Sequence, residues 1–332
     1  MIVDVHHHWL PEAHVRHFER YMGTAEEARR TDDRVTLYRD GLPVFPNIPP
    51  EMYDTERQIA LMDAAGIDVA VLHTALWPEW CDLAMCREVN DGIAQAVRRY
   101  PERLVGLAHV PVGEEGAIGE LERAVRDLGF RGVAVNTHVH RLQLPLDARP
   151  FWPFWQKVAE LDVPVVVHPS SLPLEYRMIK DYDLHRTLGR LQDMVAASAR
   201  LVYSGLFDDF PNLRFIMGHM GGGFYAVAER VLGVYTFHPH NPASAAGAHL
   251  AKLYVDTAPP FWPRASVGAA IETLGDGNIL LGSDFPIGVS WLDQAVAMIR
   301  DMGFAPDVTR RIMGDNAAAL FKLPGEGSAK RP

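Results

Sequence analysis

Histidine and aspartate residues follow several of the apolar runs in this sequence. The first group is Asp4-Val5-His6-His7-His8, close to the N-terminus. Side chains alternate between the two faces of a strand, so a strand here would place His6 and His8 on the same face. Two imidazoles on one face form a bidentate site for a metal ion. A solvated histidine cluster without a metal is the alternative interpretation.

Three more residues of this kind, His168, His219 and Asp284, follow later apolar runs. A single histidine at the end of a strand is more often a packed or hydrogen-bonded residue than a ligand. Three strand ends of this type are difficult to obtain by chance, and in a barrel they would all face the same mouth. Three imidazoles and one carboxylate suit Zn²⁺ or another borderline divalent ion.

Short runs rich in β-branched residues alternate with helical patterns along the chain, which places the protein in the α/β class. The expected strands are Ile2–His6, Asp68–His73, Leu104–Val110, Gly132–Thr137, Val163–His168, Leu213–His219, Lys252–Asp256 and Asn278–Ser283. Several are continuous apolar runs, which is typical of strands buried on both faces. Eight strands with intervening helices favour a (β/α)8 TIM barrel over a doubly wound sheet, and no Gly-x-Gly-x-x-Gly follows the first strand.

Two segments interrupt this alternation and are expected to be irregular loop insertions over the C-terminal mouth of the barrel. Residues 23–52 are polar and then proline-rich, and residues 172–192 are rich in charged and aromatic residues. Clear helical patterns lie elsewhere, for example at Asp54–Ala65, which ends before Gly66. We expect one domain over residues 1–323 and a frayed tail at 324–332.

Composition narrows the class of partner. The chain has 332 residues and a net charge of −10, from 32 Lys and Arg and 42 Asp and Glu, which makes nucleic acid an unlikely partner. No apolar run reaches the roughly 18 residues of a membrane helix, and no signal-peptide pattern is visible. The two cysteines, Cys81 and Cys86, are expected to be reduced thiols. We therefore expect a soluble, cytoplasmic protein that binds a small molecule.

Motifs in the same order along nearly the whole chain resemble the amidohydrolase superfamily, and within it the branch typified by aminocarboxymuconate-semialdehyde decarboxylase. The matching segments are Asp4–Pro11 (DVHHHWLP), Gly132–His138 (GVAVNTH), His168-Pro169, Phe210–Leu213, Gly218–Phe224, Leu281–Pro286 and Gly314–Phe321 (GDNAAALF). The resemblance is specific for the superfamily and the branch, and much less specific for the substrate.

The resemblance implies roles for the residues identified above. His6, His8, His168 and Asp284 would hold one divalent metal ion, usually zinc and in some relatives manganese. His219 would be the acid/base rather than a ligand. No carboxylated lysine is expected, since Asn136 and Thr137 stand at the end of the fourth strand. Asp256, at the end of the seventh, is expected to orient a ligand of the metal.

These roles agree with elementary chemistry. A metal ion lowers the pKa of the water that it binds towards neutrality, and a nearby histidine exchanges protons in the same pH range. Decarboxylation of an unsaturated acid requires a proton at carbon, which His219 and the bound water would deliver. The metal would polarise a substrate oxygen or carboxylate.

Arginines are the expected anchors for a substrate carboxylate. Arg230 matches an arginine that, in the resembled decarboxylase, reaches into the neighbouring subunit's site, which implies a homodimer; a surface ion pair with Glu229 is the alternative. The family's other carboxylate-binding arginine is missing, since no arginine follows Gly41 before Arg57. This departure puts the family's own dicarboxylate substrate in doubt.

Other residues are candidates for the rest of the pocket. Arg186, in the second insertion, would meet an acidic group of the substrate, or would only be solvated on a loop. Trp77 would form an aromatic wall or cap the barrel rim. His138 matches the family's Thr-His and is expected to line the pocket.

The sequence thus predicts an enzyme. The leading hypothesis is a metal-dependent, non-oxidative decarboxylase, a carboxy-lyase, that acts on an aromatic or unsaturated carboxylic acid. The alternative is a hydrolase or hydratase of the same fold, acting on a lactone, amide or enol acid, with Asp284 as general base. An inactive barrel that only binds a partner would require a broken ligand set, and here every expected ligand is present.

Overall fold

A ring of parallel strands forms the centre of the computed structural model, which describes residues 1–11, 26–32, 34–39, 41–74, 79, 81–173, 179–233 and 246–324. Its strands are β1 (Val3–His8), β5 (Val69–His73), β6 (Leu104–Gly106), β7 (Ala108–His109), β8 (Val133–Asn136), β11 (Val165–His168), β12 (Phe215–Met217), β13 (Leu253–Asp256) and β14 (Ile279–Leu280). They pair in the orders β1-β5-β6 and β7-β8-β11-β12-β13-β14.

The first and last strands close this ring. The amide of Val5 donates a hydrogen bond to the carbonyl of Leu281 at 2.9 Å, and the amide of His8 donates to Phe285 at 2.7 Å. β6 and β7 are two parts of one expected strand, interrupted at Leu107. The predicted (β/α)8 barrel is confirmed, although β12 and β14 end earlier than expected, at Met217 and Leu280.

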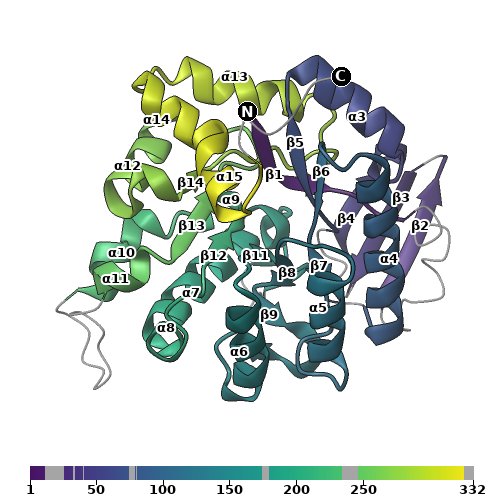
Figure 1. Ribbon diagram of the computed structural model, residues 1–332, viewed down its shortest axis with the longest axis horizontal. Coiled ribbons are helices and arrows are strands. Elements are labelled where there is room, and N and C mark those ends of the chain that lie inside the picture. Colours follow the sequence, from purple (N-terminus) through teal and green to yellow (C-terminus); the bar gives the residue numbers. More distant parts are fainter. Residues whose placement is uncertain are drawn as a thin grey trace.

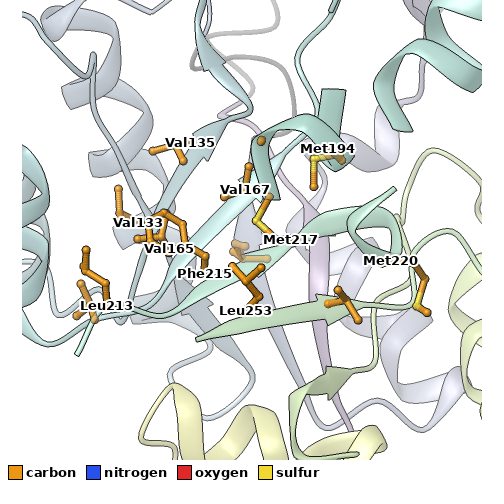
Figure 2. Packing of buried hydrophobic residues seen from close by; sticks show 14 of the residues in the cluster. Val133, Val135, Val165, Val167, Met194, Leu213, Phe215, Met217, Met220 and Leu253 are labelled. Atoms are coloured by element: carbon orange, nitrogen blue, oxygen red, sulfur yellow. The ribbon is translucent and has the colours of Figure 1, made fainter. Parts of the chain in front are cut away.

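Valines of β11 alternate between two buried layers. Val165 and Val167 pack outside the ring, together with residues of β8 and β12 (Figure 2). Val166 lies in a separate cluster inside the barrel, with Ile216 of β12. Because side chains alternate along a strand, His168 lies on the same side as Val166 and faces the barrel interior.

Helices surround the ring (Figure 1). They are α3 (Thr55–Ala65), α4 (Leu83–Arg99), α5 (Ala117–Arg126), α6 (Trp152–Leu161), α7 (Arg190–Tyr203), α8 (Leu206–Asp209), α9 (Gly218–Gly221), α10 (Tyr225–Leu232), α11 (Ala246–Leu250), α12 (Arg264–Leu274), α13 (Trp291–Asp301), α14 (Pro306–Arg310) and α15 (Asn316–Leu320). α3 begins one residue after the predicted start, because Asp54 is its N-cap and accepts a hydrogen bond from the amide of Arg57 at 2.9 Å; it ends as predicted before Gly66, at φ 72°.

The first insertion is not the irregular loop that its prolines suggest. Its described part forms a three-stranded antiparallel sheet of β2 (Glu26–Thr31), β3 (Arg34–Arg39) and β4 (Leu42–Ile48), which we call the cap sheet (Figure 1). Pro43 and Pro46 are compatible with this sheet because β4 is an edge strand that pairs only with β3. Val44 and Ile48 are buried in a cluster of their own.

Hydrogen bonds connect the cap sheet to the loops at the barrel mouth. The buried guanidinium of Arg39 in β3 donates from Nη1 to Glu79 and to Ser171, each at 2.7 Å. From the second insertion, His185 donates from Nε2 to the carbonyl of Pro43 at 3.1 Å. The two insertions therefore contact each other. In the second, described residues form a π-helical turn (His185–Gly189) that continues into α7, where an irregular loop was expected.

Smaller elements complete the described chain. They are the strands β9 (His138–Val139) and β10 (Leu144–Pro145), the 3-10 turns at Pro50–Met52, His140–Leu142, Arg149–Phe151 and Asp276–Asn278, and a π turn at Arg311–Asp315. Among the described helices, none combines the length and apolar character needed to cross a membrane. Residues 325–332 of the expected tail lie outside the described residues, and the single domain over 1–323 stays a prediction.

Candidate active site

His6 and His8 lie at the carboxyl end of β1, with their ring centres 5.0 Å apart. The pairing of β1 with β5 shifts register between Asp4 and His7, so simple alternation does not describe this end of the strand. Asp4 stabilises the irregular segment, because its Oδ1 accepts from the amide of His6 at 3.1 Å and its Oδ2 lies 3.0 Å from Nδ1 of His7. Both His6 and His8 are fully buried inside the barrel.

Asp256, the last residue of β13, orients His6. Its Oδ2 lies 2.8 Å from Nδ1 of His6, and its side chain is fully buried. This contact assigns the Nδ1 proton to the hydrogen bond with Asp256, as the sequence led us to expect of this residue. Nε2 of His6 has no hydrogen-bond partner in the described part of the chain, and it is the nitrogen that is available to a metal.

Asp284, which is distant from β1 in the sequence, lies beside His6 and His8. Its Oδ1 lies 2.9 Å from Nε2 of His8 and 3.6 Å from Nε2 of His6. It does not end a strand as predicted, since β14 stops four residues earlier. Instead, the amide of Asp284 donates to the carbonyl of His6 at 2.9 Å, and Ser283 donates from its amide to Asp4 at 3.0 Å. These bonds to β1 hold Asp284 at φ 63°.

His168 and His219 complete the group. His168 ends β11 and donates from Nδ1 to the carbonyl of Pro169 at 2.8 Å, which leaves its Nε2 available. His219 follows β12 in a left-handed turn with φ 51°, and its amide donates to Oδ1 of Asp256 at 3.0 Å. Its ring centre lies 4.8 Å from that of His6 and 5.5 Å from that of His168.

These residues fit a divalent metal ion. Ligand atoms of His6, His168, His219 and Asp284 all lie within 4.8 Å of one another. Over the described residues, Nε2 of His6 and Nδ1 of His8 are buried without a hydrogen-bond partner, which is an arrangement that a metal ion would relieve. Imidazole nitrogens with one carboxylate are the donor set that Zn²⁺ and similar ions prefer.

Burial and the neighbouring charges set the protonation states. Burial lowers the pKa of His219 to about 4 and lowers that of His168 well below its ordinary value. Burial also raises the pKa of Asp284, but the bond from His8 and the nearby histidines lower it to about 2. For His6, burial lowers the pKa, yet Asp256, Asp284 and Asp4 together raise it to about 9. At pH 7, Asp284 is therefore ionised and His219 is neutral.

Comparison with known proteins agrees with this geometry. The family model described as Amidohydrolase matches residues 3–323. The chain belongs to the amidohydrolase family. It is 31% identical over 303 residues to a gamma-resorcylate decarboxylase from Polaromonas sp. (strain JS666), covering 84% of this chain and 91% of the relative. It is also 31% identical over 318 residues to a 2-keto-4-carboxy-3-hexenedioate hydratase from Sphingobium sp. (strain NBRC 103272 / SYK-6), covering 88% of this chain and 85% of the hydratase.

A solved structure shows the same likeness. The dihydroxybenzoic acid decarboxylase from Polaromonas sp. JS666, solved with bound manganese and the inhibitor 2-nitroresorcinol, has a TM-score of 0.77 with this amidohydrolase. The two chains are 27% identical, and the alignment covers 97% of each. The resemblance stated from the motifs is thus confirmed at the level of the superfamily, and decarboxylases are among the relatives.

The residues that were predicted to bind substrate are less closely grouped. Arg186 forms a two-point ion pair with Asp183, which includes a bond from Nε at 2.8 Å. His138 lies with Nδ1 3.2 Å from Asp193 and is buried. Arg230 is exposed in the last turn of α10. Trp77 lies outside the described residues.

Two residues of this amidohydrolase were missed by sequence reasoning. His73 ends β5 beside His8, with ring centres 4.4 Å apart. The pattern that identified His168, a histidine that ends an apolar strand, also holds at His73 and would have found it.

Arg190 is the second missed residue. It begins α7 and donates from Nη2 to the carbonyl of Val44 in the cap sheet, while its buried Nε has no hydrogen-bond partner among the described residues. Burial lowers its pKa to about 10, and its charge is attracted by Glu79 and Asp284. Arg190 is thus a buried cation attracted by two carboxylates, in a chain that has no arginine after Gly41 before Arg57. Nothing in the sequence distinguished it from Arg186, because its place depends on where α7 begins.

Proposed function

We propose that this chain is a metal-dependent, non-oxidative decarboxylase, a carboxy-lyase, of an aromatic or unsaturated carboxylic acid. The observation that carries the proposal is the group of His6, His168, His219 and Asp284 at the barrel mouth, whose ligand atoms all lie within 4.8 Å of one another, with His8 bonded to Asp284 at 2.9 Å. Decarboxylases among the relatives support the same reaction class.

In this proposal His6, His8, His168 and Asp284 hold one divalent ion, which acts as a Lewis acid toward a substrate oxygen. We propose zinc, because imidazole-rich sites bind zinc more tightly than manganese. Manganese is the alternative, since a related structure contains it. Metal content after purification and turnover with each ion separate the two.

His219 moves the proton. Breaking the bond to the carboxylate releases CO₂ and leaves an electron pair on the substrate carbon, which must then gain a proton. His219 is neutral at pH 7 because burial lowers its pKa to about 4, so it first accepts a proton, from a substrate hydroxyl or from water. It then donates that proton to the carbon. The hydrogen bond from its amide to Asp256 holds it in position.

Substrate anchoring is proposed for Arg190, whose charge is attracted by Glu79 and Asp284. A guanidinium suits an acidic or phenolic group of the substrate. His138, Arg186 and Trp77 remain candidates. We further propose a homodimer in which the exposed Arg230 serves the partner's site, and a cytoplasmic location as the sequence predicts.

A hydratase is the second candidate function, because a hydratase is also among the relatives with 31% identity. In that reaction water adds across a carbon–carbon double bond. Asp284 would act as general base and accept a proton from the attacking water. His219 would transfer a proton to the substrate carbon. The two functions differ in whether the product loses CO₂ or gains water.

Mass spectrometry in D₂O tests the assignment. Protein reconstituted with zinc or with manganese is incubated with hydroxybenzoic acids including gamma-resorcylate, aminobenzoic and muconic-type acids, keto-enol acids and lactones. A decarboxylase releases CO₂ and places deuterium on the carbon that lost it; a product heavier by water establishes the hydratase or hydrolase.

Two variants serve as controls. H219N must abolish turnover, whereas H249N, which alters a buried histidine bonded to Asp208 and Val202, must leave it close to wild type. If no acid loses CO₂ with either metal while another substrate gains water, the decarboxylase proposal is wrong.

A further inference from the structure

His73 is a buried histidine with no assigned role. It is the last residue of β5, and its exposed fraction is 0%. Neither Nδ1 nor Nε2 has a hydrogen-bond partner within the part of the chain that the structure describes. An imidazole that is buried and unpartnered on both sides loses its hydrogen bonds to water without replacing them, so a group absent from the protein chain itself is expected to contact it.

Four imidazoles lie close together at the barrel mouth. The rings of His6, His8, His73 and His168 are all mutual neighbours. Their six centre-to-centre distances are 5.0 Å (His6–His8), 4.8 Å (His6–His73), 5.3 Å (His6–His168), 4.4 Å (His8–His73), 5.2 Å (His8–His168) and 5.6 Å (His73–His168). No pair stands apart from the others, so His73 is as much a member of this group as the three histidines already expected to bind metal.

These separations match imidazoles bound to a single ion. With metal–nitrogen bonds of about 2.0–2.1 Å and ring centres about 1.1 Å behind the bonding nitrogen, two ligands at a right angle have ring centres about 4.5 Å apart. At the tetrahedral angle the same bonds give about 5.2 Å. The observed range of 4.4–5.6 Å spans these two values and excludes rings on opposite sides of an ion.

A second metal ion that also uses His6 does not explain His73. Ligand atoms of His6, His8 and His73 form a group of their own within 4.8 Å, but this group shares His6 with the group of His168, His219 and Asp284. Nδ1 of His6 is committed to Asp256 at 2.8 Å, so His6 offers only Nε2. One imidazole nitrogen binds one ion, so the two groups cannot each hold an ion through His6 at the same time.

We propose that His73 is a further ligand of the divalent ion, so that four histidines and Asp284 together hold it. This rests on the metal centre of the proposed function, but not on the reaction that the centre catalyses. A site with four imidazoles favours zinc or cobalt over manganese, because affinity for nitrogen donors rises along that series of metals. With five protein ligands, a six-coordinate ion would have one position left for a substrate oxygen.

Crystals of the zinc-loaded protein test the proposal directly. An anomalous difference map collected at the zinc edge locates the ion without reference to activity. A peak with a nitrogen of His73 within about 2.3 Å supports the proposal. A peak bound by His6, His8, His168 and Asp284 with both nitrogens of His73 beyond about 3 Å overturns it.

Solution measurements with cobalt alone provide the second test. The variant H73Q is compared with H109Q, which alters another fully buried histidine at the end of a neighbouring strand, bonded to the amide of Thr74 at 3.1 Å. We expect H73Q to lose at least about tenfold in cobalt affinity and to change the intensity of the visible cobalt bands, while H109Q changes neither. Wild-type affinity and an unchanged spectrum in H73Q would contradict the proposal.

Each outcome stays interpretable. Circular dichroism of both variants without metal separates loss of a ligand from loss of the fold, and H73F replaces H73Q if the latter does not fold. Because these measurements use no substrate, their result does not depend on whether the protein is a decarboxylase or a hydratase.

Discussion

The carboxylate of Asp256 lies 2.8 Å from Nδ1 of His6, and the same side chain accepts a hydrogen bond from the amide of His219 at 3.0 Å. One buried carboxylate thus orients a proposed metal ligand and the proposed proton carrier together. Asp256 comes from β13, His6 from β1 and His219 from the turn after β12. The geometry of the site therefore depends on three strands holding their relative positions.

Replacing Asp256 with asparagine is expected to weaken metal binding by about 10–100-fold, because His6 loses the partner that fixes its tautomer. Competition with a chelator measures the affinity, and turnover at saturating metal measures the effect on His219. The matched control is D162N, since Asp162 forms ion pairs with Arg214 and Lys322 at the surface. Equal metal affinity in D256N and D162N would contradict the role assigned to Asp256.

Metal binding is expected to release protons in a pH-dependent manner. The pKa of His6 in the metal-free protein is raised to about 9 from 6.5, so His6 is protonated at pH 7.5 and must lose that proton to bind a metal. His8 and His168 have lowered pKa values and Asp284 is ionised, so they add no further release. Zinc titrations in buffers of different ionisation enthalpy should give about one proton per ion at pH 7.5 and fewer at pH 10.

The raised pKa of His6 also makes the free energy of unfolding depend on pH. Since the folded-state pKa of His6 lies above the ordinary value, its contribution to the free energy of unfolding is fully present below pH 6.5 and is lost as the pH rises through about 9. Urea unfolding of the metal-free protein across this range measures the loss. D256N should flatten the curve, and an identical pH dependence in the variant would show that another group is responsible.

Arg190 and Arg186 provide a matched pair for substrate binding. R190Q is expected to weaken binding of an acidic inhibitor such as a nitrophenol by about 10–100-fold, because a charged hydrogen bond contributes about 1.5–3 kcal/mol. R186Q should change binding less than about threefold, since Asp183 already holds that guanidinium in a two-point ion pair. Calorimetry with the inhibitor measures both, and a reversed order would move the anchor to Arg186.

Gly282 is expected to be intolerant of a side chain. A methyl group added there would lie 2.9 Å from Cβ of His6 and 3.1 Å from Cβ of Asp256, so G282A must displace one of them. We predict a loss of metal affinity together with a destabilisation of about 1–3 kcal/mol. G277A is the control, since a methyl group at Gly277 meets no atom within 4 Å. Normal metal binding by G282A would show that the site adapts more freely than proposed.

Mixing two inactive variants tests the proposed dimer. R230Q lacks the arginine offered to the partner, and D284N lacks a proposed metal ligand. In a mixed dimer, the intact site of the R230Q chain receives Arg230 from the D284N chain. Random reassociation should then restore about one quarter of wild-type activity, since half of the dimers are mixed and each has one complete site. No recovery, with both variants dimeric, would remove Arg230 from the partner's site.

The barrel was predictable because its signals are local. Runs such as Val165–Val167 are apolar on both faces, and the helices between them carry their own start and stop residues, for example Asp54 and Gly66. The histidines at the strand ends follow from the same local pattern. His73 shows this pattern too, since it ends the apolar strand β5.

What the sequence could not predict depends on distant contacts. Pro43 and Pro46 argue against a strand, and β4 tolerates them only because it lies at an edge of the cap sheet. Arg190 contacts Val44 across 146 residues, a relationship that no local pattern encodes. Asp284 was expected to end β14, but its position is set by bonds to His6 and by the bonds of Ser283 to Asp4.

The closure of the barrel by its first and last strands also has a consequence for biosynthesis. His8 leaves the ribosome 276 residues before Asp284, which is bonded to it in the folded protein, and His6 leaves earlier still. A nascent chain therefore exposes several histidines long before the carboxylate that completes the site is available. We expect the ion to be acquired only after Asp284 and the segment that pairs with β1 have been synthesised, when the ring can close.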